Sequence, residues 1–373
     1  MGDRLIVYML ALYRKYRPKS FAELVGQEQA AEIFRNAARQ GKLAHAYVLY
    51  GPRGTGKTTV ARLIAKLANC LSQDHVKKEG EPCNACAACS EIDAGRAMDV
   101  IEIDAASNRG IDEIRDLKES IRVSPSSYTH KIFIVDEAHM LTGAAWNALL
   151  KTLEEPPERT IIILATTEYE KIPATIASRA QRFHFNKIPL QTIVLKLKEI
   201  ATKETIAVSD DVLEFIAASS DGGLRDAESL LDQITVLSDA PDIASVEAIV
   251  GRAGAKRVIA CANAVVARDV SAVLAQIADI QAAGGNIVDL NKELIMYLRR
   301  ALALRFDPML EPSFKDELTK EELASVKTHS AAIDPQAIIA LLKSLIRAYT
   351  EMRYSPFPHV PFEVAMIEHL GQK

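Results

Sequence analysis

The stretch that decides the fold is "AYVLYGPRGTGKTTVARLIAKLANCL", residues 46–71. An apolar run typical of a buried strand is followed by a glycine-rich turn and then by apolar residues at helical spacing. The turn matches the pattern G-x-x-x-x-G-K-[ST] from Gly51 to Thr58, in the strand–loop–helix context that the pattern requires. It predicts a phosphate-binding loop at a helix start, where backbone N–H groups and the helix dipole both favour an anion.

The pattern assigns a role to each position of this loop. The glycines allow backbone N–H groups to close around phosphate oxygens, Lys57 reaches the β and γ phosphates, and the Thr58 hydroxyl can ligate Mg²⁺. The residues expected to contact the nucleotide are Gly51, Pro52, Arg53, Gly54, Thr55, Gly56, Lys57, Thr58 and Thr59. A glycine-rich turn alone is often only a turn, so the prediction of ATP and Mg²⁺ depends on the complete pattern.

A second motif supports this prediction. The segment "HKIFIVDEAHM", residues 130–140, has an apolar strand pattern that ends in Asp136 and Glu137. In nucleotide hydrolysis the first acid holds the Mg²⁺ shell, and the second orients and polarises the attacking water. Two adjacent acids could simply cap the next helix, but their pairing with the phosphate-binding loop favours the catalytic interpretation.

Strand and helix patterns alternate around these motifs up to about residue 188. Apolar strand patterns lie at residues 46–50, 99–107, 130–140, 159–168 and 181–186, with helical patterns at 110–123 and 143–157. This alternation predicts an α/β fold: a doubly wound parallel sheet with the phosphate-binding loop at the carboxyl edge of its strands. Beyond residue 188 almost every segment has helical periodicity.

Composition indicates a globular chain with two to three domains. Its 373 residues carry a formal net charge of −4, so a nucleic-acid partner would have to be met by a local basic surface. The apolar run near the start is too brief to span a bilayer, has no small-residue cleavage site and continues into basic residues. We therefore expect a cytoplasmic protein with no membrane partner.

A cytoplasmic location bears on the cysteines, because disulfides are rare there. Cys70, Cys83, Cys86 and Cys89 have the spacing C-x12-C-x2-C-x2-C, which predicts a closed tetrahedral zinc site with a structural role. His75 is a weaker candidate ligand and is expected to be a solvated loop histidine. The fifth cysteine, Cys261, lies in an apolar helical pattern and is expected in a core.

With these motifs in hand, the chain resembles the AAA+ ATPases. More closely, it resembles the gamma/tau family of clamp-loader subunits of bacterial DNA polymerase III, over essentially its whole length. The segments that carry the resemblance are "YRKYRPKSFAELVGQEQA", "LLKTLEEPP", "LATT", "ASRAQRFHF", "GGLRDAESLLDQ" and the cysteine module. The resemblance implies a AAA+ domain with an inserted zinc module, followed by a three-helix lid and an all-helical collar.

The resemblance also implies roles for three further residues. Thr167 fits the sensor of the γ-phosphate, with Thr166 as a close alternative. Arg225 fits the lid arginine that contacts the nucleotide of its own subunit, and Arg179 fits the arginine finger that enters a neighbouring subunit's site. The family usually has cysteine where this sequence has Ala180, a departure that does not affect the arginine beside it.

Domain boundaries follow from the changes of pattern. We expect an ATPase domain at residues 1–188 with the zinc module at about 70–90, a lid at 189–250, and a collar for oligomerisation at 251–373. An extra stretch at residues 1–9 departs from the family. The sequence stops soon after the collar, so the extended tail of the tau form is not expected in it.

The implied function is ATP hydrolysis within the DNA polymerase III holoenzyme, a nucleotidyltransferase complex, during DNA replication. The subunit would load the ring-shaped sliding clamp onto primed DNA, within a hetero-oligomeric ring of delta, delta-prime and further copies of itself. The residues expected to carry the activity are Lys57, Asp136, Glu137, Thr167, Arg179 and Arg225. Arg109, between a strand end and a helix start, is the candidate contact to the DNA phosphates.

Two other functions are open to the same motifs. The letters "DEAH" at residues 136–139 also occur in a class of helicases, but those need a second strand-rich lobe, and residues after 188 have helical patterns. A non-hydrolysing scaffold that binds ATP is the remaining alternative, because a lone subunit's arginine finger serves another molecule.

Overall fold

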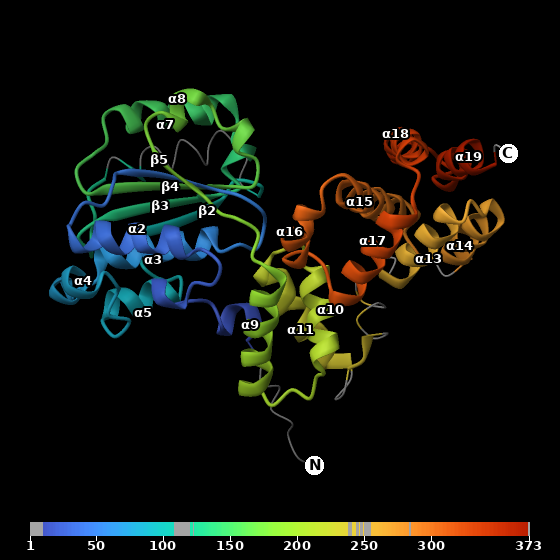
Figure 1. The fold of residues 1–373 in the computed structure, drawn as a ribbon. Coiled ribbons are helices and arrows are strands. Elements are labelled where there is room, and N and C mark those ends of the chain that lie inside the picture. Colours follow the sequence, from blue (N-terminus) through green and yellow to red (C-terminus); the bar gives the residue numbers. More distant parts are fainter. Residues whose placement is uncertain are drawn as a thin grey trace, which may run out of the picture. The chain divides into compact units, whose positions relative to one another are not determined.

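Five parallel strands form the sheet that organises the first half of the chain (Figure 1). The strands are β1 (Ala46–Tyr50), β2 (Val100–Asp104), β3 (Lys131–Asp136), β4 (Thr160–Thr166) and β5 (Gln181–His184). Their order across the sheet is β2-β3-β4-β1-β5. Each lies within a strand pattern predicted from the sequence, so the prediction of a parallel α/β sheet is confirmed.

The sheet is buried on both faces because apolar side chains alternate toward two separate cores. Tyr47 and Leu49 of β1 pack with α2 and α3, whereas Ala46 and Val48 pack with α7. Figure 1 shows the same layers, with α2 and α3 on one face of the sheet and α7 and α8 on the other. This arrangement explains why the strands read as continuous apolar runs rather than as alternating patterns.

Helices and single 3-10 turns precede the first strand and connect the strands that follow. They are α1 (Leu12–Lys15), η1 (Phe21–Glu23), α2 (Glu28–Arg39), α3 (Lys57–Asn69), α4 (Gln73–Glu79), α5 (Ala87–Asp93), η2 (Ala138–Met140), α7 (Gly143–Glu154), η3 (Tyr169–Lys171) and α8 (Ala174–Ala177). The cysteine module, residues 70–93, carries α4 and α5, which pack on α2 and α3 away from the sheet. It is therefore an insertion outside the sheet.

The computed structural model describes residues 10–107, 120–121, 123–237, 241–243, 246, 249, 255–282 and 285–371. Arg109 lies outside these residues. The chain divides into two compact units: Met1–Thr192 with Gly222–Ser229, and Ile193–Asp221 with Leu230–Lys373. Helices α9 (Leu190–Lys203) and α11 (Leu224–Leu237) have residues in both units. The division into ATPase, lid and collar domains stays a prediction.

Among the described residues of the second unit, all regular elements are helices. Its elements include α10 (Asp210–Ser219), α13 (Ala255–Val266), α14 (Val270–Ala282), α15 (Ile287–Phe306), η4 (Pro308–Leu310), α16 (Glu311–Lys315), α17 (Lys320–Ala332), α18 (Pro335–Met352) and α19 (His359–Leu370). Cys261 lies fully buried in this core, as expected. A polar chain crosses the core: His329 hydrogen-bonds through its two ring nitrogens to the Tyr297 hydroxyl at 2.7 Å and to Asn263 Oδ1 at 2.6 Å.

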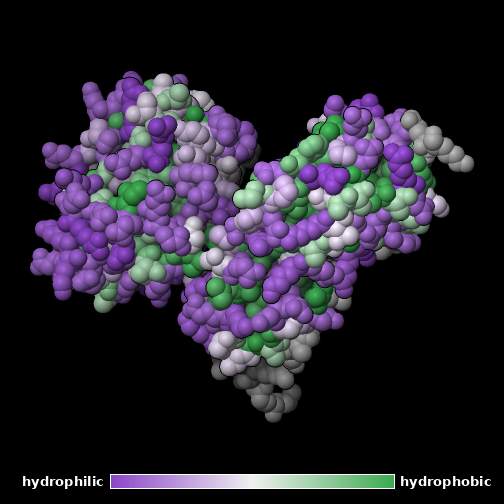
Figure 2. All heavy atoms as spheres, in the orientation of Figure 1, coloured by the Kyte–Doolittle hydropathy of each residue, from purple (hydrophilic) through white to green (hydrophobic). Residues whose placement is uncertain are grey.

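The face of the molecule in Figure 2 is mostly hydrophilic, with hydrophobic residues in small separate areas on the first unit. Among the described helices, none combines the length and the apolar character needed to cross a bilayer.

Candidate nucleotide and metal sites

The predicted catalytic residues, apart from Arg179, come together at the carboxyl edge of the sheet. Parallel strands place their carboxyl ends on one edge, so the loop after β1, the acids ending β3 and the threonines ending β4 become neighbours. A cavity of about 390 Å³ lies there within the first unit. Its lining includes Tyr13, Arg17, Pro18, Leu24, Val25, Arg53, Gly54, Thr55, Gly56, Lys57, Thr58, Thr59, Asp104, Asp136, Glu137, Leu224, Arg225 and Glu228.

The first glycine of the loop is required by the sheet. Gly51 has φ of +145°, and a Cβ atom there would lie 2.1 Å from the carbonyl oxygen of Phe185. No side chain can occupy that space without moving the backbone that follows β5. The loop is thus pressed against the sheet edge at its start, and the glycine is needed whether or not a phosphate is bound.

Lys57 and Thr58 are held by groups of the same cavity. Lys57 Nζ donates to the carbonyl oxygens of Gly51 at 2.8 Å and Pro52 at 2.6 Å. Burial lowers the pKa of Lys57, while the carboxylates of Glu137 and Asp136 act to raise it. Thr58 Oγ1 donates to Asp136 Oδ2 at 2.8 Å, which brings together the two groups that fit a Mg²⁺ ion.

Glu137 is oriented by the end of β4. Its backbone has φ of +46°, in the left-handed region that non-glycine residues seldom adopt. Thr167 Oγ1 donates to Glu137 Oε2 at 3.0 Å. Thr166 instead is fully buried, and its Oγ1 hydrogen-bonds His139 Nδ1 at 3.0 Å. Of the two threonines, Thr167 is the one that contacts the acid.

His139 was not predicted as a site residue, although it stands in the quoted "DEAH" letters. Its Nδ1 lies 3.4 Å from Glu137 Oε2, and its Nε2 lies 3.1 Å from Glu168 Oε1. This ring links the ends of two strands, because it contacts Glu137 after β3 as well as Thr166 and Glu168 at the end of β4.

Arg225 lies beside the phosphate-binding loop, within the first unit. Its backbone N–H donates to Gly54 O at 3.4 Å, and its guanidinium lies 4.9 Å from the centroid of the Tyr13 ring. Such a distance fits a cation–π contact. Tyr13 itself was not singled out from the sequence, because the approach of residues 13 and 225 is a product of the fold.

Arg179 is not among the residues that line this cavity. Its guanidinium pairs with Glu154 Oε1 at 2.9 Å and donates to Thr175 O at 2.7 Å, and its side chain is 36% exposed. The structure therefore places this arginine on the surface, bound to the end of α7, and not on its own chain's cleft.

Gln27 is a further residue that sequence reasoning missed. It is 5% exposed, and its Nε2 donates to Asn186 O at 2.8 Å and to Thr55 O at 3.5 Å. The Asn186 N–H donates back to Gln27 Oε1 at 3.3 Å. This amide fastens the start of α2 to the phosphate-binding loop and to the chain after β5. The family segment "VGQEQA" was the available signal.

The four predicted zinc ligands form a cluster. The sulfur atoms of Cys70, Cys83, Cys86 and Cys89 all lie within 4.8 Å of one another. Tetrahedral zinc–sulfur bonds of about 2.3 Å place sulfurs about 3.8 Å apart, so a small contraction would close them around one ion. His75 is not part of the cluster; it is exposed as expected but lies on helix α4, which corrects the prediction of a loop.

The surroundings raise the pKa of some of these thiols and lower that of another. Burial raises the pKa of Cys89, and it raises that of Cys70 as well. Burial acts to raise the pKa of Cys83 too, but hydrogen bonds that include the N–H groups of Ala85 and Cys86 outweigh it and lower that pKa to about 6. Four thiolates this close repel one another, so full deprotonation needs a cation. The donor set fits zinc.

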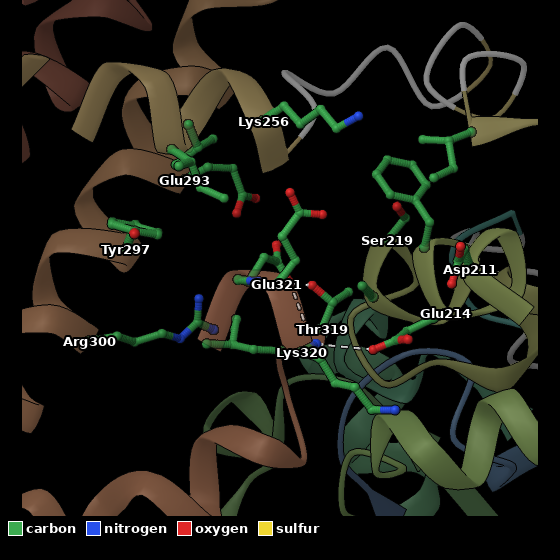
Figure 3. Close-up of a pocket in the computed structure, with 17 residues that line it drawn as sticks. Asp211, Glu214, Ser219, Lys256, Glu293, Tyr297, Arg300, Thr319, Lys320 and Glu321 are labelled. Atoms are coloured by element: carbon green, nitrogen blue, oxygen red, sulfur yellow. Dashed lines mark hydrogen bonds between the residues drawn. The ribbon is translucent and has the colours of Figure 1, made fainter. Parts of the chain in front are cut away.

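A second cavity, of about 360 Å³, lies in the second unit between α10, α13, α15 and α17 (Figure 3). Acidic and basic side chains face it from several sides, and Glu214 Oε1 accepts the Lys320 N–H at 3.2 Å at the start of α17. Arg300, which also lines the cavity, pairs with Glu317 at 2.8 Å. This mixture of charges defines no single ligand, so the sheet edge remains the candidate catalytic site.

Three family models match consecutive parts of the chain. They are DNA polymerase III, delta subunit, over residues 26–189; DNA polymerase III clamp loader subunit, ATPase lid domain, over 192–239; and DNA polymerase III subunits gamma and tau domain III, over 242–371. The DNA polymerase III subunit tau of Bacillus subtilis is 43% identical over 361 residues. The chain belongs to the gamma/tau family. That resemblance, predicted from the sequence, is confirmed.

Relatives in this family are longer than the chain. The alignment with the B. subtilis protein covers 96% of this chain and 62% of the relative. The DNA polymerase III subunit tau of Escherichia coli is 34% identical over 96% of the chain and 55% of its own length. Among solved structures, the DNA clamp loader delta protein of B. subtilis covers 91% of this chain and is itself covered to 99%, at 12% identity and a TM-score of 0.42, too distant to add to the assignment.

Proposed function

We propose that this gamma/tau-family chain is an ATP-hydrolysing subunit of the clamp loader, which loads the sliding clamp onto primed DNA for DNA polymerase III. The observation that supports it most is that the motif residues meet in one cleft. The glycine loop, the Thr58–Asp136 hydrogen bond and the Thr167–Glu137 hydrogen bond meet at one edge of one sheet. A subunit with a purely structural role would need none of these contacts.

Each side chain of the cleft has a defined task in this proposal. Lys57 neutralises charge on the phosphates, for which its amine leaves the carbonyl oxygens of the loop. Thr58 and Asp136 would hold Mg²⁺, which when bound neutralises charge that develops on the transferred phosphoryl group. Thr167 fixes the Glu137 carboxylate through Oε2, so Oε1 is the oxygen that we assign to the attacking water.

The two arginines act on different nucleotides. Arg225 lies against its own loop and Tyr13, so it contacts the nucleotide of the same chain. Arg179 lies off its own cleft and must leave Glu154 to act, which fits a finger donated to a neighbouring subunit. The active cleft is thus completed by a second chain.

The remaining assignments belong to the same proposal. The four thiols hold one structural zinc ion. The partners are delta, delta-prime and further copies of the chain in a hetero-oligomeric ring, together with the sliding clamp and primed DNA, in the cytoplasm.

The test compares ATPase rates of the isolated chain and of a loader reconstituted with delta and delta-prime, each with and without sliding clamp and primed DNA. We expect a low rate for the isolated chain and strong stimulation in the complete mixture, because only the assembly supplies Arg179 in trans. A reconstituted loader that loads clamps but hydrolyses no faster than the isolated chain would favour the alternative of an ATP-binding scaffold. That alternative is considered because Arg179 lies outside its own cleft, so a single chain lacks this arginine at its own nucleotide site.

A further inference from the structure

One wall of the nucleotide cavity is a segment with little structure of its own. Arg17, Pro18, Leu24 and Val25 line the cavity together with the phosphate-binding loop. We call residues 17–25 the strap. Its regular structure is the single turn η1, whose two internal backbone hydrogen bonds are long, at 3.2 and 3.3 Å. Such a segment needs outside contacts to stay in place.

One of those contacts is apolar: Phe21 is 2% exposed, and its ring stacks on that of Phe34 in α2 with the centroids 5.7 Å apart. Polar contacts come from the cysteine module and from the helix that leads into it. Glu81 accepts the Phe21 N–H at 2.8 Å through one carboxylate oxygen and the Ala22 N–H at 3.0 Å through the other. Lys66 Nζ donates to Lys19 O at 3.1 Å and pairs with Asp93 at 2.9 Å. The Lys66 side chain is 1% exposed, so this pair is shielded from water on the lysine side.

Glu81 is held where it can make these bonds. Gly80 has φ of +73°, and a Cβ there would lie 2.7 Å from Arg35 O, so the loop before Glu81 lies directly on α2. Arg35 Nε is 3.2 Å from Glu81 Oε1. Two residues further on, the Cys83 N–H donates to Cys70 Sγ at 3.5 Å within the thiol cluster.

We propose that Glu81, supported by the Lys66–Asp93 pair, is a positioning residue that fastens the strap to the cysteine module and thereby sets how tightly the cleft holds its nucleotide. This inference rests on the nucleotide site of the proposed function. The module is then a brace for this wall of the cavity.

The variants are Glu81→Ala, Glu81→Gln and the control Glu79→Ala, each made in the full chain. The control removes a carboxylate from the same module that is 48% exposed and pairs with Lys78 on the surface. Binding of N-methylanthraniloyl-ADP is followed by fluorescence. Glu81→Ala should raise the Kd about 10-fold, equivalent to one net hydrogen bond, mainly through faster dissociation. Glu81→Gln, with one acceptor oxygen left, should give a smaller loss, and Glu79→Ala none.

A second readout needs no nucleotide. Trypsin cleavage at the Lys19–Ser20 bond, mapped by mass spectrometry, reports release of the strap, because Lys66 holds the carbonyl of that bond. Cleavage should accelerate in Glu81→Ala and in wild-type protein stripped of zinc with a chelator, but not in Glu79→Ala. Wild-type affinity together with wild-type cleavage in Glu81→Ala would overturn the proposal. If the wild type bound no nucleotide, the proposed function would fail, and cleavage would still decide the role of Glu81.

Zinc content is measured on every variant. A loss of affinity confined to variants that have also lost zinc would overturn the role of Glu81 and assign the effect to the ion.

Discussion

The nucleotide cleft and the thiol cluster both adjoin helix α3, one at each end, yet they are assembled in opposite ways. The cleft is lined by side chains as far apart in the sequence as Tyr13 and Arg225. They become neighbours only when the sheet and its helices have packed together. The four cysteines lie within residues 70–89 and need a cation to offset their charge. The cleft thus depends on residues far apart in the sequence, and in the proposed function also on a neighbouring chain. The thiol cluster is assembled from one short segment of a single chain.

Lys57→Ala should have the largest effect on one site, the nucleotide cleft, and none on the other, the thiol cluster. Loss of a buried lysine that we propose to contact two phosphates should lower ATP affinity by roughly 10³-fold or more, with little effect on folding. Isothermal titration with ATP and elemental analysis for zinc measure both sites on one sample. Normal ATP affinity in this variant would contradict the assignment of the loop, and loss of zinc would contradict the expectation that the cluster binds its ion without this lysine.

Arg179→Ala tests whether the cleft is completed by a second chain. Hydrolysis in the reconstituted loader should fall by up to roughly 10³-fold, while ATP binding by the isolated chain is nearly unchanged. Mixing this variant with the Lys57→Ala chain should restore some activity where the two stand in a productive order. If the isolated Arg179→Ala chain failed to bind ATP, the role in trans would be wrong.

Cys83→Ser combined with Cys86→Ser tests whether the cluster is self-contained. Elemental analysis should show one zinc per wild-type chain and none in the double variant, because two thiolates cannot close the tetrahedron. The far-ultraviolet circular dichroism should persist, since α4 and α5 lie outside the sheet. Recovery of wild-type protein without metal and with four reactive thiols would count against the zinc site.

Thr167→Ala should have a smaller effect, confined to hydrolysis. Without the 3.0 Å hydrogen bond to Glu137, the carboxylate loses its orientation, and we expect hydrolysis to fall about 10-fold with ATP affinity retained. Thr166→Val is the matched comparison: it keeps the buried volume but removes the bond to His139, so it should act mainly on stability. Equal kinetic losses in both variants would remove the distinction between the threonines.

Cys261→Ala gives the smallest expected effect and contrasts a lone thiol with the cluster. Burial raises the pKa of Cys261 to about 12, so this group stays a neutral thiol at physiological pH. Removing its sulfur should lower the free energy of unfolding by about 1 kcal/mol and leave the zinc content unchanged. A drop in zinc content would show that the fifth cysteine takes part in metal binding.

The features that could be predicted from the sequence are those formed by residues close together in the chain. Each strand is an apolar run bounded by polar or turn residues, and the phosphate-binding loop and the four cysteines each fall within a few tens of residues. The contacts between Glu81 and Phe21 and between Gln27 and Asn186 join positions 60 and 159 residues apart. Nothing in the local pattern records which loops meet, so these residues, like Tyr13 and His139, became visible only in the folded chain.

Position 51 shows that some residues of a binding motif are required by the fold and others only by the ligand. A side chain there would collide with the Phe185 carbonyl even in a protein that had lost all use for ATP. Lys57 and Thr58 meet no such barrier: they lie at the start of α3, outside the strands, so we expect the sheet to stay intact when smaller residues replace them. In a copy of this domain that has drifted away from nucleotide binding, the first glycine should therefore outlast the lysine, and its presence alone is no evidence of an active ATPase.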